Sequence, residues 1–101
     1  MNARNGMRPV HPGEILRDEL EALGLSATAL ARELDVPVNR ITAILRGHRG
    51  VTANTALRLA RYSGTTPQVW LNLQKNYELR LAEIEASHEI AERVNPRETA
   101  T

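Results

Sequence analysis

Helix-start signals recur along this chain at short intervals, and they constrain its fold more than any other feature. Residues that favour the first turn of a helix stand at His11, Ser26, Pro37, Thr52 and Thr66. Around the first four, an apolar residue just before the start is matched by another at the fourth helical position, which is the spacing of a hydrophobic staple. The pairs are Val10–Ile15, Leu25–Leu30, Val36–Ile41 and Val51–Ala56. No stretch between turn signals alternates apolar and polar residues as a strand would, so the sequence predicts an all-α fold of five helices.

The length of the chain limits this fold to one domain. A chain of 101 residues supports a single modest core, which we assign to residues 10–94. The last helix is predicted over about 67–94, which corresponds to about 40 Å at the helical rise. Four short helices cannot cover that length, so its outer half is expected to stay exposed or to pack on another subunit or protein. We expect residues 1–9 to form a flexible arm and residues 95–101 a flexible tail.

Charge is distributed unevenly along the chain although the formal net charge is only +1. Residues 36–77 carry six basic side chains and no Asp or Glu, whereas the segments on either side are both net negative. A separate positive zone of this kind is typical of a surface that docks phosphates. The alternative is a chance run of solvated arginines.

The sequence lacks the residues that several classes of function require. There is no cysteine, and the three histidines (His11, His48 and His88) fall in different predicted elements, so we expect neither a metal site nor a cofactor. No catalytic motif or phosphate-cradling glycine loop is present, so an enzyme is not expected. No apolar run is long enough to cross a bilayer, and the first residues lack the apolar stretch of a secretory signal. We therefore expect a cytoplasmic protein that does not bind membranes.

Residues 27–47 have the pattern of a helix-turn-helix. Leu30 and Leu34 face inward on the first helix, the small Ala31 between them lets the second helix cross closely, and Val36 fills the turn. The segment LARELDVPVNRITAILRG, residues 30–47, resembles the helix-turn-helix of phage-repressor-like (xre-type) regulators. It departs from that pattern at Asp35, where the family has glycine in a left-handed turn, and at Pro37, where it often has a Ser or Thr cap. Aspartate tolerates the left-handed conformation, and proline suits a helix start.

The outward face of the second helix of this helix-turn-helix carries the side chains expected to read bases. Asparagine can pair with adenine through two hydrogen bonds, small apolar groups can meet a thymine methyl, and arginine can reach guanine. The predicted base-reading residues are Val38, Asn39, Arg40, Thr42 and Ala43. Arg40 and Thr42 could instead contact phosphate. The alternative is a solvated helix face, for which an exposed valine beside an alanine is poorly suited.

The phosphate contacts and the dimer contacts are expected elsewhere. The predicted phosphate-binding residues, near the start of one helix or around the next loop, are Thr28, Arg46, Arg49, Thr52 and Asn54. The sequence leaves open whether Arg58 and Arg61 bind DNA or only flank the core. Because one module reads a half-site, we expect a homodimer on a palindromic operator. Its predicted contacts, on the long last helix, are Tyr77, Leu81 and Ile84.

Two further segments narrow the resemblance. RPVHPGEILRDEL (8–20) and GVTANTALRLARYSGTTPQVWLNLQKNYELR (50–80) are similar to the HigA family of antitoxins, and the likeness covers roughly residues 8–85. It implies a small DNA-binding protein that neutralises a HigB-type, RelE-like toxin that cleaves mRNA on the ribosome. It also implies a dimer that represses its own operon. The alternative that remains is a solitary xre-type repressor without a toxin partner.

Overall fold

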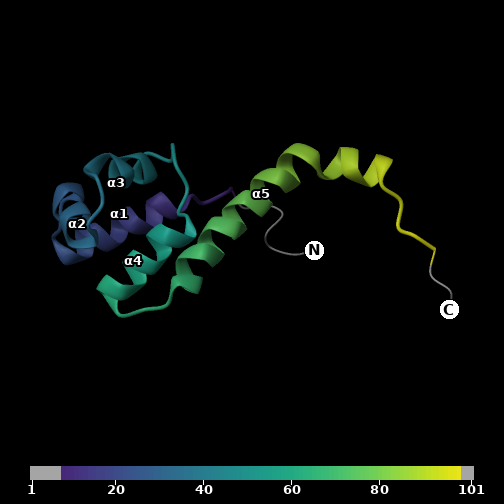
Figure 1. The fold of residues 1–101 in the computed structure, drawn as a ribbon. Coiled ribbons are helices and arrows are strands. Elements are labelled where there is room, and N and C mark those ends of the chain that lie inside the picture. Colours follow the sequence, from purple (N-terminus) through teal and green to yellow (C-terminus); the bar gives the residue numbers. More distant parts are fainter. Residues whose placement is uncertain (1–7, 99–101) are drawn as a thin grey trace.

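The computed structural model describes residues 8–98. Most of the expected arm, and the last part of the expected tail, therefore lie outside the described residues. The described chain contains five helices and no strand, which confirms the predicted all-α fold (Figure 1). The helices are α1 (Pro12–Leu23), α2 (Ala27–Leu34), α3 (Val38–Leu45), α4 (Ala53–Ser63) and α5 (Pro67–Arg93). Within this part of the chain, no helix combines the length and apolar character that crossing a membrane needs.

Three of the five predicted start residues cap their helices with side-chain hydrogen bonds, and Thr66 before α5 makes no such bond. The side chains of His11, Ser26 and Thr52 accept hydrogen bonds from backbone N–H groups of the first turns of α1, α2 and α4. Pro37 precedes α3 without a side-chain cap bond, as its chemistry requires. At the end of α2, Asp35 takes the left-handed conformation with φ 58°, which aspartate tolerates better than most residues other than glycine.

The core lies among the first four helices and the beginning of α5. Leu16 of α1, Leu30 of α2 and Ile41 of α3 are almost completely buried. Leu59 of α4 and Trp70 of α5 close the same cluster. The helix-turn-helix is thus supported from behind by side chains that are almost completely buried.

The HPGE segment at the start of α1 owes its glycine to a close crossing with α3. A Cβ atom on Gly13 would collide with the carbonyl oxygen of Ile44, which is backbone and cannot move aside cheaply. Arg17 Nη2 also donates to the carbonyl oxygen of Leu45, at 3.2 Å. The first helix therefore fixes the far end of α3.

The inner part of α5 is attached to the body by two specific contacts. The ring of Tyr77 meets the ring of His11 edge-on, with centroids 4.8 Å apart. Gln74 Oε1 accepts a 2.8 Å hydrogen bond from the backbone N–H of Val51, directly before α4. A Cβ on Gly50 would meet the Gln74 side chain, so glycine keeps this approach open. The HPGEIL and WLNLQ segments are thus parts of one packing arrangement.

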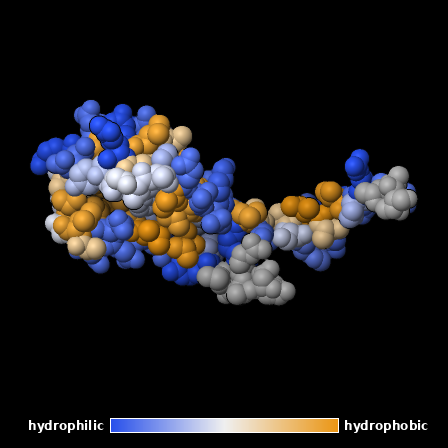
Figure 2. All heavy atoms as spheres, turned by 90° about the horizontal axis from the view of Figure 1, so that it is seen from below, coloured by the Kyte–Doolittle hydropathy of each residue, from blue (hydrophilic) through white to orange (hydrophobic). Residues whose placement is uncertain are grey.

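Beyond these contacts α5 continues away from the other helices (Figure 1). Ile84 and Ile90 are 57% and 52% exposed. Figure 2 shows apolar atoms along the narrow extension that this part of the helix forms. The outer half of α5 is therefore exposed, as expected from the length of the helix.

Candidate nucleic-acid interface

The turn between α2 and α3 holds the two helices in a fixed relation. The backbone N–H of Val36 donates to the carbonyl oxygen of Ala31 at 3.0 Å, which closes the end of α2. Ala31 is buried, and Ile41 and Ile44 of α3 have no exposed surface. With its inner face occupied in this way, α3 can present only its opposite face to a ligand.

That opposite face carries four of the five predicted base readers. Helical spacing places Val38, Asn39, Thr42 and Ala43 on one side of α3. Val38 is 44% exposed, Asn39 is also exposed, and the other two are half-buried. Thr42 Oγ1 donates to the carbonyl oxygen of Asn39 at 3.3 Å, so a nucleic acid would compete for this hydroxyl.

The fifth predicted reader, Arg40, lies at the edge of this face. Its side chain is half-buried, and its Nη1 donates to Asn54 Oδ1 of α4 at 3.2 Å. The structure therefore brings a predicted base reader into contact with a predicted phosphate contact. The sequence contains no local signal for this pairing, because the two residues are separated by the whole loop between α3 and α4.

The other predicted phosphate contacts are exposed. Thr28 lies in the first turn of α2, Thr52 caps α4, and Arg46 and Arg49 flank the loop after α3. Neither of these two arginines has a carboxylate partner among residues 8–98. Their guanidinium groups are thus available to an external anion.

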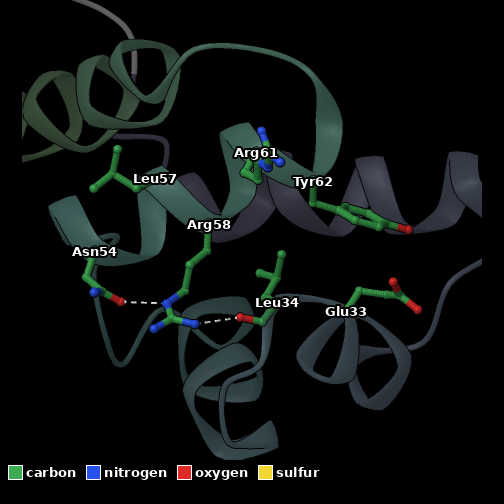
Figure 3. A pocket seen from close by; sticks show the side chains of 7 residues that line it. All are labelled: Glu33, Leu34, Asn54, Leu57, Arg58, Arg61 and Tyr62. Carbon is green, nitrogen blue, oxygen red and sulfur yellow. Dashed lines mark hydrogen bonds between the residues drawn. The ribbon is translucent and has the colours of Figure 1, made fainter.

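Arg58 has a structural role that the sequence left undecided. Its Nη1 donates to the carbonyl oxygens of Leu34 and Asp35, at 2.8 and 3.1 Å, and its Nε donates to Asn54 Oδ1 at 2.8 Å. It therefore satisfies the carboxyl end of α2 from α4 (Figure 3). The only sequence signal was the four-residue spacing between Asn54 and Arg58 on one helix.

Ion pairs in the described chain lie away from this surface. Two hydrogen bonds from Arg8 lower the pKa of the Glu14 carboxyl, and the same pairing raises the pKa of Arg8. Hydrogen bonds from Gln74 and Lys75 lower the pKa of Glu78. No group of three histidine, aspartate or glutamate side chains in residues 8–98 could hold a metal ion. None of these ion pairs involves a residue of α3.

Comparison with known proteins identifies the same region. A family model described as helix-turn-helix matches residues 16–70. Virulence-associated protein I of Dichelobacter nodosus is 56% identical over 81 residues, which is 79% of this chain and 75% of that protein. More than half of the chain thus falls within one recognised family.

Two solved structures share the fold over nearly the whole chain. One is an addiction module antidote protein of a HigA family from Coxiella burnetii, with a TM-score of 0.88 and 52% identity over 90% of this chain and all of that one. The other is the Pseudomonas aeruginosa antitoxin HigA with the higBA promoter, with a TM-score of 0.85 and 44% identity over 88% of this chain and 98% of that one. The likeness therefore includes the long α5 as well as the helix-turn-helix.

Proposed function

Because the chain belongs to the HigA type of the helix-turn-helix family, we propose that it is a sequence-specific DNA-binding antitoxin that represses its own operon. The observation that carries this proposal is the exposed edge of α3. Val38 and Asn39 stand outward there, while Ile41 and Ile44 behind them are fully buried. This edge lies in the segment that has no Asp or Glu, so phosphates meet no repulsion from it.

Recognition of the operator is assigned to the major groove. Asn39 pairs with an adenine edge, Val38 or Ala43 packs on a thymine methyl, and Thr42 bonds a base or a phosphate. Arg40, at the edge of the same face, reaches guanine or the backbone. Direct contacts of this kind carry the sequence preference.

The phosphate backbone is held on both sides of α3. Thr28 at the start of α2 contacts one stretch, and Arg46 and Arg49 neutralise charge after α3. Thr52 and Asn54 add the positive end of α4. These contacts set the register of α3 in the groove and supply affinity that does not depend on sequence.

A second copy of the chain completes the reading of a palindromic operator. Tyr77, Leu81 and Ile84 form the dimer contact along α5 in this proposal. The half-burial of Tyr77 and Leu81, and the 57% exposure of Ile84, support a contact that begins at the body and extends outward. Two half-sites in register are expected about one helical turn of DNA apart, roughly 34 Å.

The toxin partner is a HigB-type mRNA-cleaving protein encoded beside this one. The similarity to an addiction module antidote protein and to an antitoxin HigA supports this partner. Residues 78–101 carry six acidic and three basic side chains, which suits a basic partner. A short basic protein in the adjacent reading frame should stop growth alone and allow it when co-expressed with this chain. Growth arrest despite co-expression would leave the solitary repressor, which binds DNA without a toxin.

The DNA-binding proposal is tested by a salt titration on the promoter fragment. With about 6–10 phosphates neutralised per dimer, affinity should fall by about 10³–10⁵-fold between 50 and 200 mM salt. A scrambled fragment of equal length is the control. Equal affinity for both fragments, or a flat salt dependence, contradicts the proposal.

A further inference from the structure

Side chains from two helices meet at the start of α4. Asn54 Oδ1 accepts a 2.8 Å hydrogen bond from Arg58 Nε and a 3.2 Å hydrogen bond from Arg40 Nη1. Arg58 belongs to the same helix as Asn54, whereas Arg40 comes from α3, the helix assigned to base reading. One amide oxygen therefore links the two helices that contact DNA in the proposed function.

The chemistry of these groups fixes the orientation of the amide. A guanidinium group has five N–H donors and no acceptor, so only the carbonyl oxygen of Asn54 can face two of them. The amide nitrogen must then point the other way. Figure 3 shows it turned away from Arg58.

Arg58 is itself held in place. Its Nη1 is bound to the carbonyl oxygens of Leu34 and Asp35, and its side chain is half-buried between α2 and α4. It has no carboxylate partner among the described residues that could draw it elsewhere. The Nε atom of Arg40, by contrast, is buried without a hydrogen bond in the described chain, so the contact with Asn54 is a principal restraint on that guanidinium.

We propose that Arg58 is a positioning residue for DNA binding. It locks the amide of Asn54 so that Nδ2 faces outward and donates to a phosphate oxygen, and through Asn54 it steadies Arg40. This inference rests on the proposed function and adds to it. Arg58 touches no nucleic acid itself; it sets which end of Asn54 does.

A double-mutant cycle on promoter affinity tests the proposal with the full-length chain. Asn54→Ala should weaken binding by at least about tenfold, since one hydrogen bond to a charged acceptor is lost. Arg58→Lys keeps the charge but cannot hold all three oxygens, so it should weaken binding several-fold by releasing the amide. In the Asn54→Ala background, the same Arg58→Lys change should have almost no effect on affinity.

A purely structural role for Arg58 gives a different result. Loss of its bonds to Leu34 and Asp35 would lower the melting temperature equally in both backgrounds, and any effect on DNA would then be additive. Arg61→Lys, an exposed position on the same helix, is the matched control and should change neither quantity. Additive losses, or normal binding by Asn54→Ala, overturn the proposal. Failure of the unaltered chain to prefer its promoter would instead overturn the proposed function.

A second pair of variants avoids any dependence on the folding of Arg58→Lys. Asn54→Asp retains an acceptor for both arginines but puts an oxygen where the amide nitrogen stood. Ala53→Asp adds the same charge one residue earlier and removes no donor. Asn54→Asp should bind the promoter at least about tenfold more weakly than Ala53→Asp. Equal affinities would show that the outward group of Asn54 donates nothing.

Discussion

The helix-turn-helix and the outer half of α5 differ in what holds them. Around α3, buried side chains and hydrogen bonds join neighbouring helices: Ile41 has no exposed surface, and Arg58 ties α4 to the end of α2. Along the outer half of α5, the ion pairs Arg80–Glu83 and Glu89–Arg93 join residues three or four apart on the same helix. Such pairs support a helix but give it no partner.

This difference separates the face of α3, which one chain forms by itself, from the outer half of α5, which needs another molecule to bury its apolar side chains. The face of α3 already has its shape in a single chain, as a reader of a rigid duplex needs. The exposed Ile84 and Ile90 gain burial only from another molecule, which the proposed function supplies as a second copy. In the proposed function, the surface preorganised for DNA and the surface covered by a second copy therefore lie at opposite ends of the molecule (Figure 1).

The test with the largest expected effect shortens one isoleucine to alanine in each of these two regions. Ile41→Ala should lower the free energy of unfolding by about 2–5 kcal/mol, because a fully buried side chain leaves a cavity. Ile90→Ala should change it by less than about 0.5 kcal/mol, since the residue is already half exposed. Urea unfolding at a concentration where the chain is monomeric measures both. Similar losses would mean that α5 is as firmly packed as the body.

The next test asks whether the exposed face of α3 reads bases. Asn39→Ala should weaken promoter binding by about 1–3 kcal/mol and relax the preference at one base position, because it removes a bidentate contact while leaving the core intact. Competition with promoter variants altered one base pair at a time measures the preference. Arg49→Ala, a predicted phosphate contact, should weaken binding to all variants alike. An unchanged preference in Asn39→Ala would refute its role.

A charged substitution tests whether the outer half of α5 forms the dimer contact. Ile84→Asp should leave the melting temperature of the monomer almost unchanged and shift the monomer–dimer equilibrium by at least about tenfold, since a carboxylate would be buried in the interface. Sedimentation equilibrium at micromolar concentration measures the shift. The same substitution at the exposed Leu57 of α4 should not affect association. A chain that is monomeric without any substitution would remove the proposed interface.

The smallest expected effect concerns the Arg8–Glu14 pair beside α1. Pairing lowers the pKa of Glu14 in the folded chain, so its contribution to stability is present above the pKa of the unfolded carboxyl and is lost as pH falls through the folded pKa. Glu14→Gln should therefore lower the melting temperature slightly at pH 7, and the difference should shrink as the pH falls. Glu85→Gln, in the outer half of α5, is the control. A Glu14→Gln effect that does not shrink on acidification would exclude the ion pair as its source.

Most of the fold could be predicted from local signals, and much of the site could not. The caps at His11, Ser26 and Thr52 allowed the starts of their helices to be predicted, because a cap acts within one turn of the residue itself. The contacts of Arg58 with Leu34 and of Gln74 with Val51 span 24 and 23 residues, and nothing near either residue in the chain indicates the partner. Such contacts exist only after the helices have packed.

The sequence alone determined where the helices begin, which of their faces are apolar, and that the basic segment includes α3, because these properties depend on neighbours within a few residues. The tertiary structure alone decided that Gly13 must leave room for the backbone at Ile44, and that Arg58 donates both to the end of α2 and to the side-chain oxygen of Asn54. Both depend on the distance and angle between packed helices. Those are set by the sum of many buried contacts rather than by any one segment of the chain.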